Sequence, residues 1–247
     1  REQRVQVALF DATRYSIHAG PKVAVTYKGE RTEVPELVGR HCPNLVYPNF
    51  EDWGYVKVEL DDRSFETAKQ QLSRVEDPLL RSMLWQSMWD SVTDGKSSLK
   101  QYINVALVNA PLEEDYTILG QVIQNLKQAQ QYLNSMAPNH QAYASKVSKA
   151  LTQMSLRMAM QHHDNADFQR RWFDSYVSLA SSQHALDHLA DLLEGNATIK
   201  GLNISQDLRW KIIIKLNQYD YPQSGLIAIE EKHRDLSDSG QKSAIAA

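Results

Sequence analysis

The feature that most constrains the fold is a change in hydrophobic period at residues 61 and 62. From Tyr55 to Leu60 polar and apolar residues alternate, which is the period-two pattern of a strand with one buried face. The pattern then becomes helical: in the segment that follows Asp77, apolar residues recur every four positions from Leu80 to Val92. We therefore predict β structure before the change and only helices after it.

The first 62 residues contain about five short runs that are typical of strands. They are Arg4–Phe10, Lys22–Tyr27, Arg31–Val34, Asn44–Tyr47 and Tyr55–Leu60. Residues 28–30 (Lys-Gly-Glu) predict a hairpin turn between the second and third runs. We predict a small β-sandwich over residues 1–62, truncated at its N-terminus and therefore open at one edge.

Residues 63–247 contain roughly ten helical segments joined by short connections. Ser64 is the predicted N-cap of the first, and Asp77 with Pro78 opens the second. The later segments are Leu99–Ala110, Glu114–Met136, Ala142–Met160, Asp167–Ser181, Ser182–Leu193, Ser205–Gln218, Gly225–Arg234 and Ser239–Ala247. No motif repeats at a fixed period, so we predict an irregular α-solenoid of antiparallel helix pairs, similar to HEAT or armadillo arrays. Trp85 and Trp89 are predicted to lie in its core.

Composition excludes several classes of function. The net charge of −3 does not favour a nucleic-acid or anionic-membrane partner, and no apolar run is long enough to span a bilayer. Cys42 is the only cysteine, which excludes an internal disulfide and a cysteine-based zinc cluster. The chain begins at Arg1 rather than Met, so we expect it to be part of a longer protein. We expect a cytoplasmic location, because two glycosylation triplets are the only features compatible with secretion.

One helical segment has the histidine spacing of a zinc site. His184 and His188 lie one helical turn apart, and Asp191 could join them on the same face. A zinc peptidase also needs a glutamate after the first histidine, where this chain has Ala185. Two surface histidines on an amphipathic helix are therefore the favoured interpretation. His162, His163 and Asp164 (residues 162–164) are predicted to lie in a loop, and no residue is assigned a catalytic, metal-binding or substrate-binding role.

Several stretches of this chain resemble a known enzyme family. GERTEVPELVGRHCPNLVYPNFEDWGYVKVELDDRS (Gly29–Ser64) and DPLLRSMLWQSMWDSVTDG (Asp77–Gly95) resemble bacterial zinc aminopeptidase N enzymes, the gluzincin alanyl/lysyl aminopeptidases, in the form found in actinobacteria. GLNISQDLRWKIIIKL (Gly201–Leu216) resembles the family's Asp-Leu-Arg-Trp helix, and Asp235–Gly240 resembles its Asp-x-Ser/Thr-x-x-Gly ending. The resemblance covers nearly the whole chain and is weakest between about residues 137 and 182.

The resemblance implies the last two parts of a four-part exopeptidase, a linking β-sandwich (1–62) and a helical C-terminal domain (63–247) that closes over the active site. Zinc belongs to the full-length enzyme, and its ligands and catalytic motifs are not in this chain. We therefore expect this segment alone to be inactive. Its implied partners are its own upstream catalytic domain and peptide substrates.

Two other interpretations remain open. The chain could be a free-standing helical-repeat adaptor that binds other proteins. Less favoured is a small metal-dependent enzyme that uses His184, His188 and Asp191.

Overall fold

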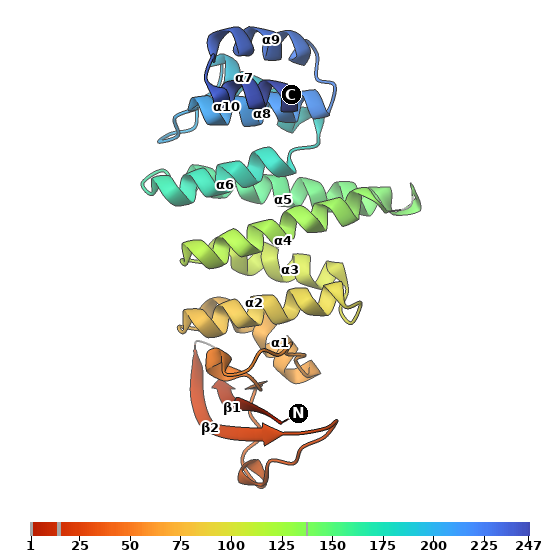
Figure 1. Ribbon diagram of the computed structural model, residues 1–247, viewed down its shortest axis with the longest axis vertical. Coiled ribbons are helices and arrows are strands. Elements are labelled where there is room, and N and C mark those ends of the chain that lie inside the picture. Colours follow the sequence, from red (N-terminus) through yellow and green to blue (C-terminus); the bar gives the residue numbers. More distant parts are fainter. Residues whose placement is uncertain (1, 14–15, 137) are drawn as a thin grey trace. The chain divides into compact units, whose positions relative to one another are not determined.

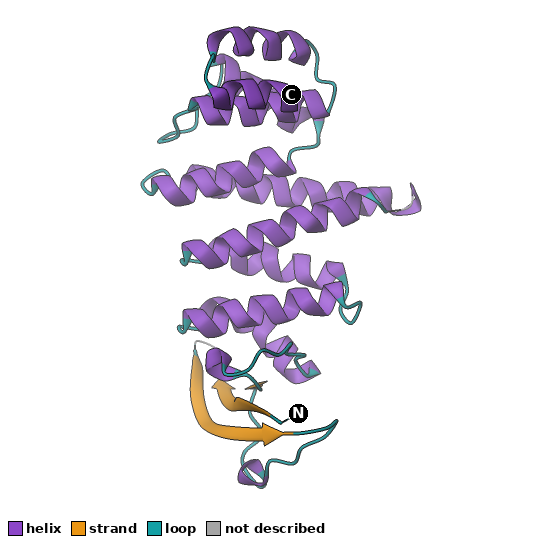
Figure 2. Ribbon diagram, viewed as in Figure 1, coloured by secondary structure: helices purple, strands orange, loops and turns teal. Residues whose placement is uncertain are grey.

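The computed structural model describes residues 2–13, 16–136 and 138–247. It is mostly helical, with one small antiparallel sheet near the N-terminus (Figure 1 and Figure 2). Contacts group the chain into two compact units, residues 1–125 and 126–247, and the division falls within α4 (Tyr116–Asn134). In the ranges that the structure describes, no helix is both long and apolar enough to cross a membrane.

The sheet of the first unit has three strands in the order β2-β1-β3. They are β1 (Gln3–Ala12), β2 (Ile17–Tyr27) and β3 (Leu45–Tyr47). Figure 1 shows β2 as a long bent strand. Its register with β1 shifts between Ala8 and Phe10, opposite Gly20 and Pro21. The run predicted from Lys22 is therefore too short at its start: the strand begins at Ile17, and the irregularity accommodates Gly20 and Pro21 within it.

Two of the five predicted strands are wrong. Residues 31–34 are irregular and lead into a 3-10 turn, Pro35–Leu37, so the hairpin is formed by β1 and β2 instead. Residues 55–60 do alternate as predicted: Val58 is buried, whereas Tyr55, Lys57 and Glu59 are exposed. They have no strand partner among the described residues. Lys57 instead forms an ion pair of 2.8 Å with Asp94, just after α2. The prediction failed because a period of two indicates extended backbone with two different faces, but it does not show that a neighbouring strand is present.

The helices of the first unit begin at residue 62. They are α1 (Asp62–Gln71), α2 (Pro78–Thr93), α3 (Leu99–Asn109) and the first part of α4. Asp61, not Ser64, is the N-cap of α1, and its Oδ1 accepts a hydrogen bond from the Ser64 amide at 3.0 Å. The Ser64 hydroxyl accepts from the Val46 amide at 2.9 Å and so joins α1 to β3.

The core of the first unit contains the two tryptophans that the sequence placed there. Trp85 is 2% exposed and Trp89 is 5% exposed, which confirms the prediction. Both rings meet Tyr102 of α3 edge-on, with centroid distances of 5.9 and 4.8 Å. The Tyr102 hydroxyl accepts a hydrogen bond from Asn125 Nδ2 at 3.0 Å, so the polar end of this buried ring is satisfied.

The second unit continues α4 and adds six helices. They are α5 (Gln141–Gln161), α6 (Ala166–Leu179), α7 (Gln183–Glu194), α8 (Gln206–Gln218), α9 (Ser224–Arg234) and α10 (Asp238–Ala246). No strand occurs in the described residues between 100 and 240, as the helical period predicts. Ser182 caps α7, and Gly195, with φ of 84°, ends it.

Polar side chains join α8 to the two helices that follow it. Arg209 donates to both carboxylate oxygens of Glu231 in α9, at 2.8 and 2.7 Å, and Glu231 is 2% exposed. Trp210 Nε1 donates to Asp235 Oδ2 at 2.7 Å. Gly240 packs so closely on this corner that a Cβ there would lie 2.5 Å from the Asp235 carbonyl oxygen. The Asp-Leu-Arg-Trp and Asp-x-Ser-x-x-Gly motifs therefore hold the C-terminal helices together.

Candidate functional site: a lysine-lined pocket

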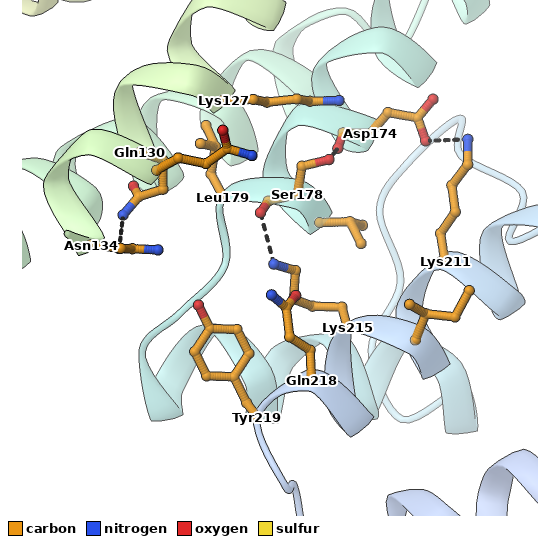
Figure 3. A pocket seen from close by; sticks show the side chains of 13 residues that line it. Lys127, Gln130, Asn134, Asp174, Ser178, Leu179, Lys211, Lys215, Gln218 and Tyr219 are labelled. Atoms are coloured by element: carbon orange, nitrogen blue, oxygen red, sulfur yellow. Dashed lines mark hydrogen bonds and ion pairs between the residues drawn. The ribbon is translucent and has the colours of Figure 1, made fainter. Parts of the chain in front are cut away.

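A pocket of about 470 Å³ lies within the second unit, among α4, α6 and α8 (Figure 3). We call it the lysine pocket because Lys127, Lys211 and Lys215 line it. The other lining residues are Gln130, Gln131, Asn134, Asp174, Val177, Ser178, Leu179, Ile214, Gln218 and Tyr219. Three ammonium groups face one carboxylate, so the lining has a formal charge of two positive units.

Lys215 is the most buried of the three lysines, with 9% of its surface exposed. Its position follows from the run Ile212-Ile213-Ile214, which places α8 against the core with Lys215 on the buried side. Its Nζ donates to the Ser178 carbonyl oxygen at 2.8 Å, in the last turn of α6, where a positive charge offsets the helix dipole. Burial, and after it the charge of Lys127, lowers the pKa of Lys215 to about 8.

Lys211 lies one turn before Lys215 and is already paired. Its Nζ lies 3.1 Å from Asp174 Oδ1 and 3.3 Å from Asp207 Oδ2. Arg170 approaches the same two carboxylates, so Asp174 and Asp207 are shared between two cations. Asp174 is therefore largely neutralised by its neighbours.

Lys127 differs from the other two lysines because its charge is not directly matched. It is half-buried, and within the described ranges its ammonium has no hydrogen-bond or ion-pair partner. Burial is the main cause that lowers its pKa; Asp174 opposes this shift. Figure 3 shows the side chain extending toward Asp174, which Lys211 approaches from the other side.

Amide side chains form the opposite part of the wall. Gln130 is 8% exposed, and its Nε2 donates to Asn134 Oδ1 at 2.8 Å and to Ser148 Oγ at 2.7 Å. Its Oε1 is buried without a hydrogen-bond partner among the described residues. Because Asn134 uses its oxygen in this bond, its amide hydrogens remain available as donors. The pocket can thus hold an anion or donate hydrogen bonds to carbonyl groups, but it contains no paired base and nucleophile.

The predicted histidine pair lies on α7 and is used differently. His184 is exposed, whereas His188 is half-buried and its Nδ1 lies 2.9 Å from the Tyr176 hydroxyl of α6. Burial, and then the charge of His184, lowers the pKa of His188. The prediction of two surface histidines is therefore right for His184 and wrong for His188. Residues 162–164 form a turn, as predicted, and the His162 ring packs on Phe168 with centroids 5.4 Å apart.

The residues present do not fit a zinc ion. Over residues 2–13, 16–136 and 138–247, no three or more His, Cys, Asp and Glu side chains are grouped closely enough to hold a metal. His188 Nδ1 is engaged by Tyr176, and Asp191 does not complete a set with the two histidines. The two histidines of α7 therefore do not form a zinc site with Asp191.

Comparison with known proteins identifies the fold. The model of the family described as ERAP1-like C-terminal domain matches residues 45–247, which is most of the chain and includes all ten helices that the structure describes. The chain belongs to this family.

A relative in Streptomyces lividans, Aminopeptidase N, is 28% identical over 249 aligned positions. The alignment covers 100% of this chain and 28% of that protein, so the chain spans between a quarter and a third of its relative. The predicted resemblance to the C-terminal part of an aminopeptidase N is thereby confirmed.

The lysine pocket of this ERAP1-like C-terminal domain was not found from the sequence. Lys127 lies 84 positions before Lys211 and 88 before Lys215 along the chain, and no motif connects it to them. One indication was present: Lys211 and Lys215 are four positions apart, so they lie on one face of a helix whose intervening residues are three isoleucines. That Lys127 meets them could be known only from the packing of α4, α6 and α8.

Proposed function

We propose that this ERAP1-like C-terminal domain is the non-catalytic C-terminal region of a zinc aminopeptidase that removes N-terminal amino acids from peptides. The observation that carries the proposal is the alignment of the whole chain with an aminopeptidase N, of which it matches only 28%. The remaining part of such a protein is long enough to hold a complete catalytic domain. The zinc ion and its ligands would belong there, since the residues of this chain that the structure describes do not fit them.

In this proposal the helices from residue 63 onward form an irregular α-solenoid. The solenoid is a wall around the active-site chamber that admits thin, unfolded peptides and keeps bulk water from the chemistry. Residues 1–62 complete a small β-sandwich with neighbouring parts of the longer protein and act as a spacer. The partners are the protein's own upstream catalytic domain and its peptide substrates, and the location is the cytoplasm.

Reassembly from two pieces tests the proposal. The region that precedes this chain in the native gene should contain His-Glu-x-x-His and should be produced separately, then mixed with this chain. We expect a complex that elutes as one species and releases alanine or lysine from short peptides in a chelator-sensitive reaction. Removal of the helices from the longer protein should increase cleavage of folded proteins relative to short peptides.

Other results would favour the rival functions. A preceding region without a zinc motif, together with capture of unrelated folded proteins by this chain, would favour the helical-repeat adaptor. The small metal-dependent enzyme requires turnover by this chain alone.

A further inference from the structure

The lysine pocket contains more hydrogen-bond donors than its own residues use. Lys127 has no direct partner among the described residues, and Lys215 uses one of its three protons on the Ser178 carbonyl. The amide hydrogens of Asn134 and Gln218 are also uncommitted within the part of the chain that the structure describes. Several donors therefore lack an acceptor at a site that also carries two excess positive charges.

Structural roles account for two of the lysines but not for the third. Lys215 caps the C-terminal turn of α6, and Lys211 shares Asp174 and Asp207 with Arg170. Lys127 performs neither function, although burial of an unpaired ammonium is unfavourable. A bound anion would supply the missing partner and would also reduce the repulsion between Lys127 and Lys215.

We propose that the lysine pocket binds a small dianion of the phosphate class, held by Lys127 and Lys215 with Lys211 at its edge. A dianion would neutralise the two excess charges, and lysine ammonium groups are common phosphate ligands. The volume of about 470 Å³ exceeds what a phosphate group fills and is typical of sites for small organic ligands. Val177, Leu179 and Ile214 supply an apolar wall for such an organic part. This inference is independent of the proposed function.

The test is a calorimetric titration of the purified chain with inorganic phosphate, at an ionic strength held constant with chloride. We expect saturable binding at one site. Lys127→Gln should weaken it by about tenfold or more, because a charge-assisted hydrogen bond is lost at a half-buried position. Lys146→Gln, an exposed lysine of α5 outside the pocket, is the matched control and should leave the affinity unchanged. Lys211→Gln, at the edge of the site, should have a smaller effect than Lys127→Gln.

Further titrants identify the source of the phosphate group. Phenyl phosphate binding more tightly than inorganic phosphate would assign the site to an organic phosphate ester that uses the apolar wall. Equal affinities would assign it to free phosphate. Acetate binding as tightly as phosphate would overturn the proposal of a dianion. Absence of saturable phosphate binding, or phosphate binding unaffected by Lys127→Gln, would overturn the site itself.

Discussion

Trp89 shows how much of the stability of the first unit depends on single aromatic side chains. Its ring is 5% exposed and packs edge-on against Tyr102. We expect Trp89→Ala to lower the free energy of unfolding by roughly 3–5 kcal/mol, because the removed ring leaves a cavity that the helices cannot fill. Denaturant unfolding measures the change.

Trp53 is the matched control for that substitution, since its ring is 45% exposed. Trp53→Ala should change the free energy of unfolding by no more than about 1 kcal/mol. Equal midpoints for Trp89→Ala and the unmodified chain would contradict the assignment of Trp89 to the core.

Lys215 makes stability depend on pH in the alkaline range. Its pKa is about 8 in the folded chain, against about 10.4 for an unfolded lysine, so between these pH values the unfolded chain binds more protons. The free energy of unfolding contributed by Lys215 therefore rises with pH across this window and is constant below it. Relative to that of Lys215→Met, the free energy of unfolding of the unmodified chain should rise by up to about 3 kcal/mol between pH 7 and pH 10.5.

Comparison with a variant at the same pH removes the contribution of other groups. The buried tyrosines oppose the trend above pH 10, since burial raises the pKa of Tyr47 to about 12, but they are the same in both chains. Lys146→Met, at an exposed site, should give a difference from the unmodified chain that does not vary with pH. A flat difference for Lys215→Met would show that its ammonium is well solvated.

At the scale of elements, the ion pair of Arg209 and Glu231 joins α8 to α9. The Arg209 guanidinium, through direct hydrogen bonds, lowers the pKa of the Glu231 carboxyl. Arg209→Met would remove the ion pair of a carboxylate that is 2% exposed and leave it with the hydrogen bond from Gln206 Nε2, and we expect the free energy of unfolding to fall by about 3–5 kcal/mol in chemical denaturation. Adding Glu231→Gln should recover part of this loss, because the stranded charge is then removed.

Arg234 and Glu230 form an exposed pair on α9 itself, with side chains about two-thirds exposed. Arg234→Met should therefore cost less than about 1 kcal/mol. If the changes in the free energy of unfolding for Arg209→Met and Glu231→Gln simply added in the double variant, the two side chains would not be coupled. That result would contradict their assignment as the pair that joins α8 to α9.

The helices were more predictable than the strands, of which three of the five predicted are present. A helix carries its own hydrogen bonds, so the caps at Asp77 and Ser182 and the end at Gly195 could be located from local sequence. A strand needs a partner, and residues 55–60 have the right alternation without one. The run predicted from Lys22 is too short, because the register shift allows β2 to continue through Gly20 and Pro21, residues that usually end a strand.

At the scale of the whole molecule, family membership was predictable, and the compact units and the lysine pocket were not. The family was recognised from motifs such as Asp-Leu-Arg-Trp. In the structure, Arg209 and Trp210 of this motif each have a specific partner, Glu231 and Asp235. The compact units divide at residues 125 and 126, within a helix, where no change in composition marks the chain. A domain boundary at residues 62 and 63 remains a prediction.

We expect this chain alone to release no amino acid from any peptide. No described group of side chains fits zinc, and α7 has Ala185 where a peptidase would have its glutamate base. The measurement is hydrolysis of alanyl and lysyl chromogenic substrates with added zinc, with and without a chelator. Chelator-sensitive turnover that disappears in a His184→Ala, His188→Ala double variant would support the metal-dependent enzyme instead.

Within the described residues, β2 has a neighbouring strand on one side only. A straight open edge of this length could recruit copies of itself and seed fibrils when the chain is concentrated. Pro21 supplies no amide hydrogen, and the bulge beside it bends the strand, so neither half offers a long flat template. We therefore expect the bend to disfavour self-aggregation through this edge.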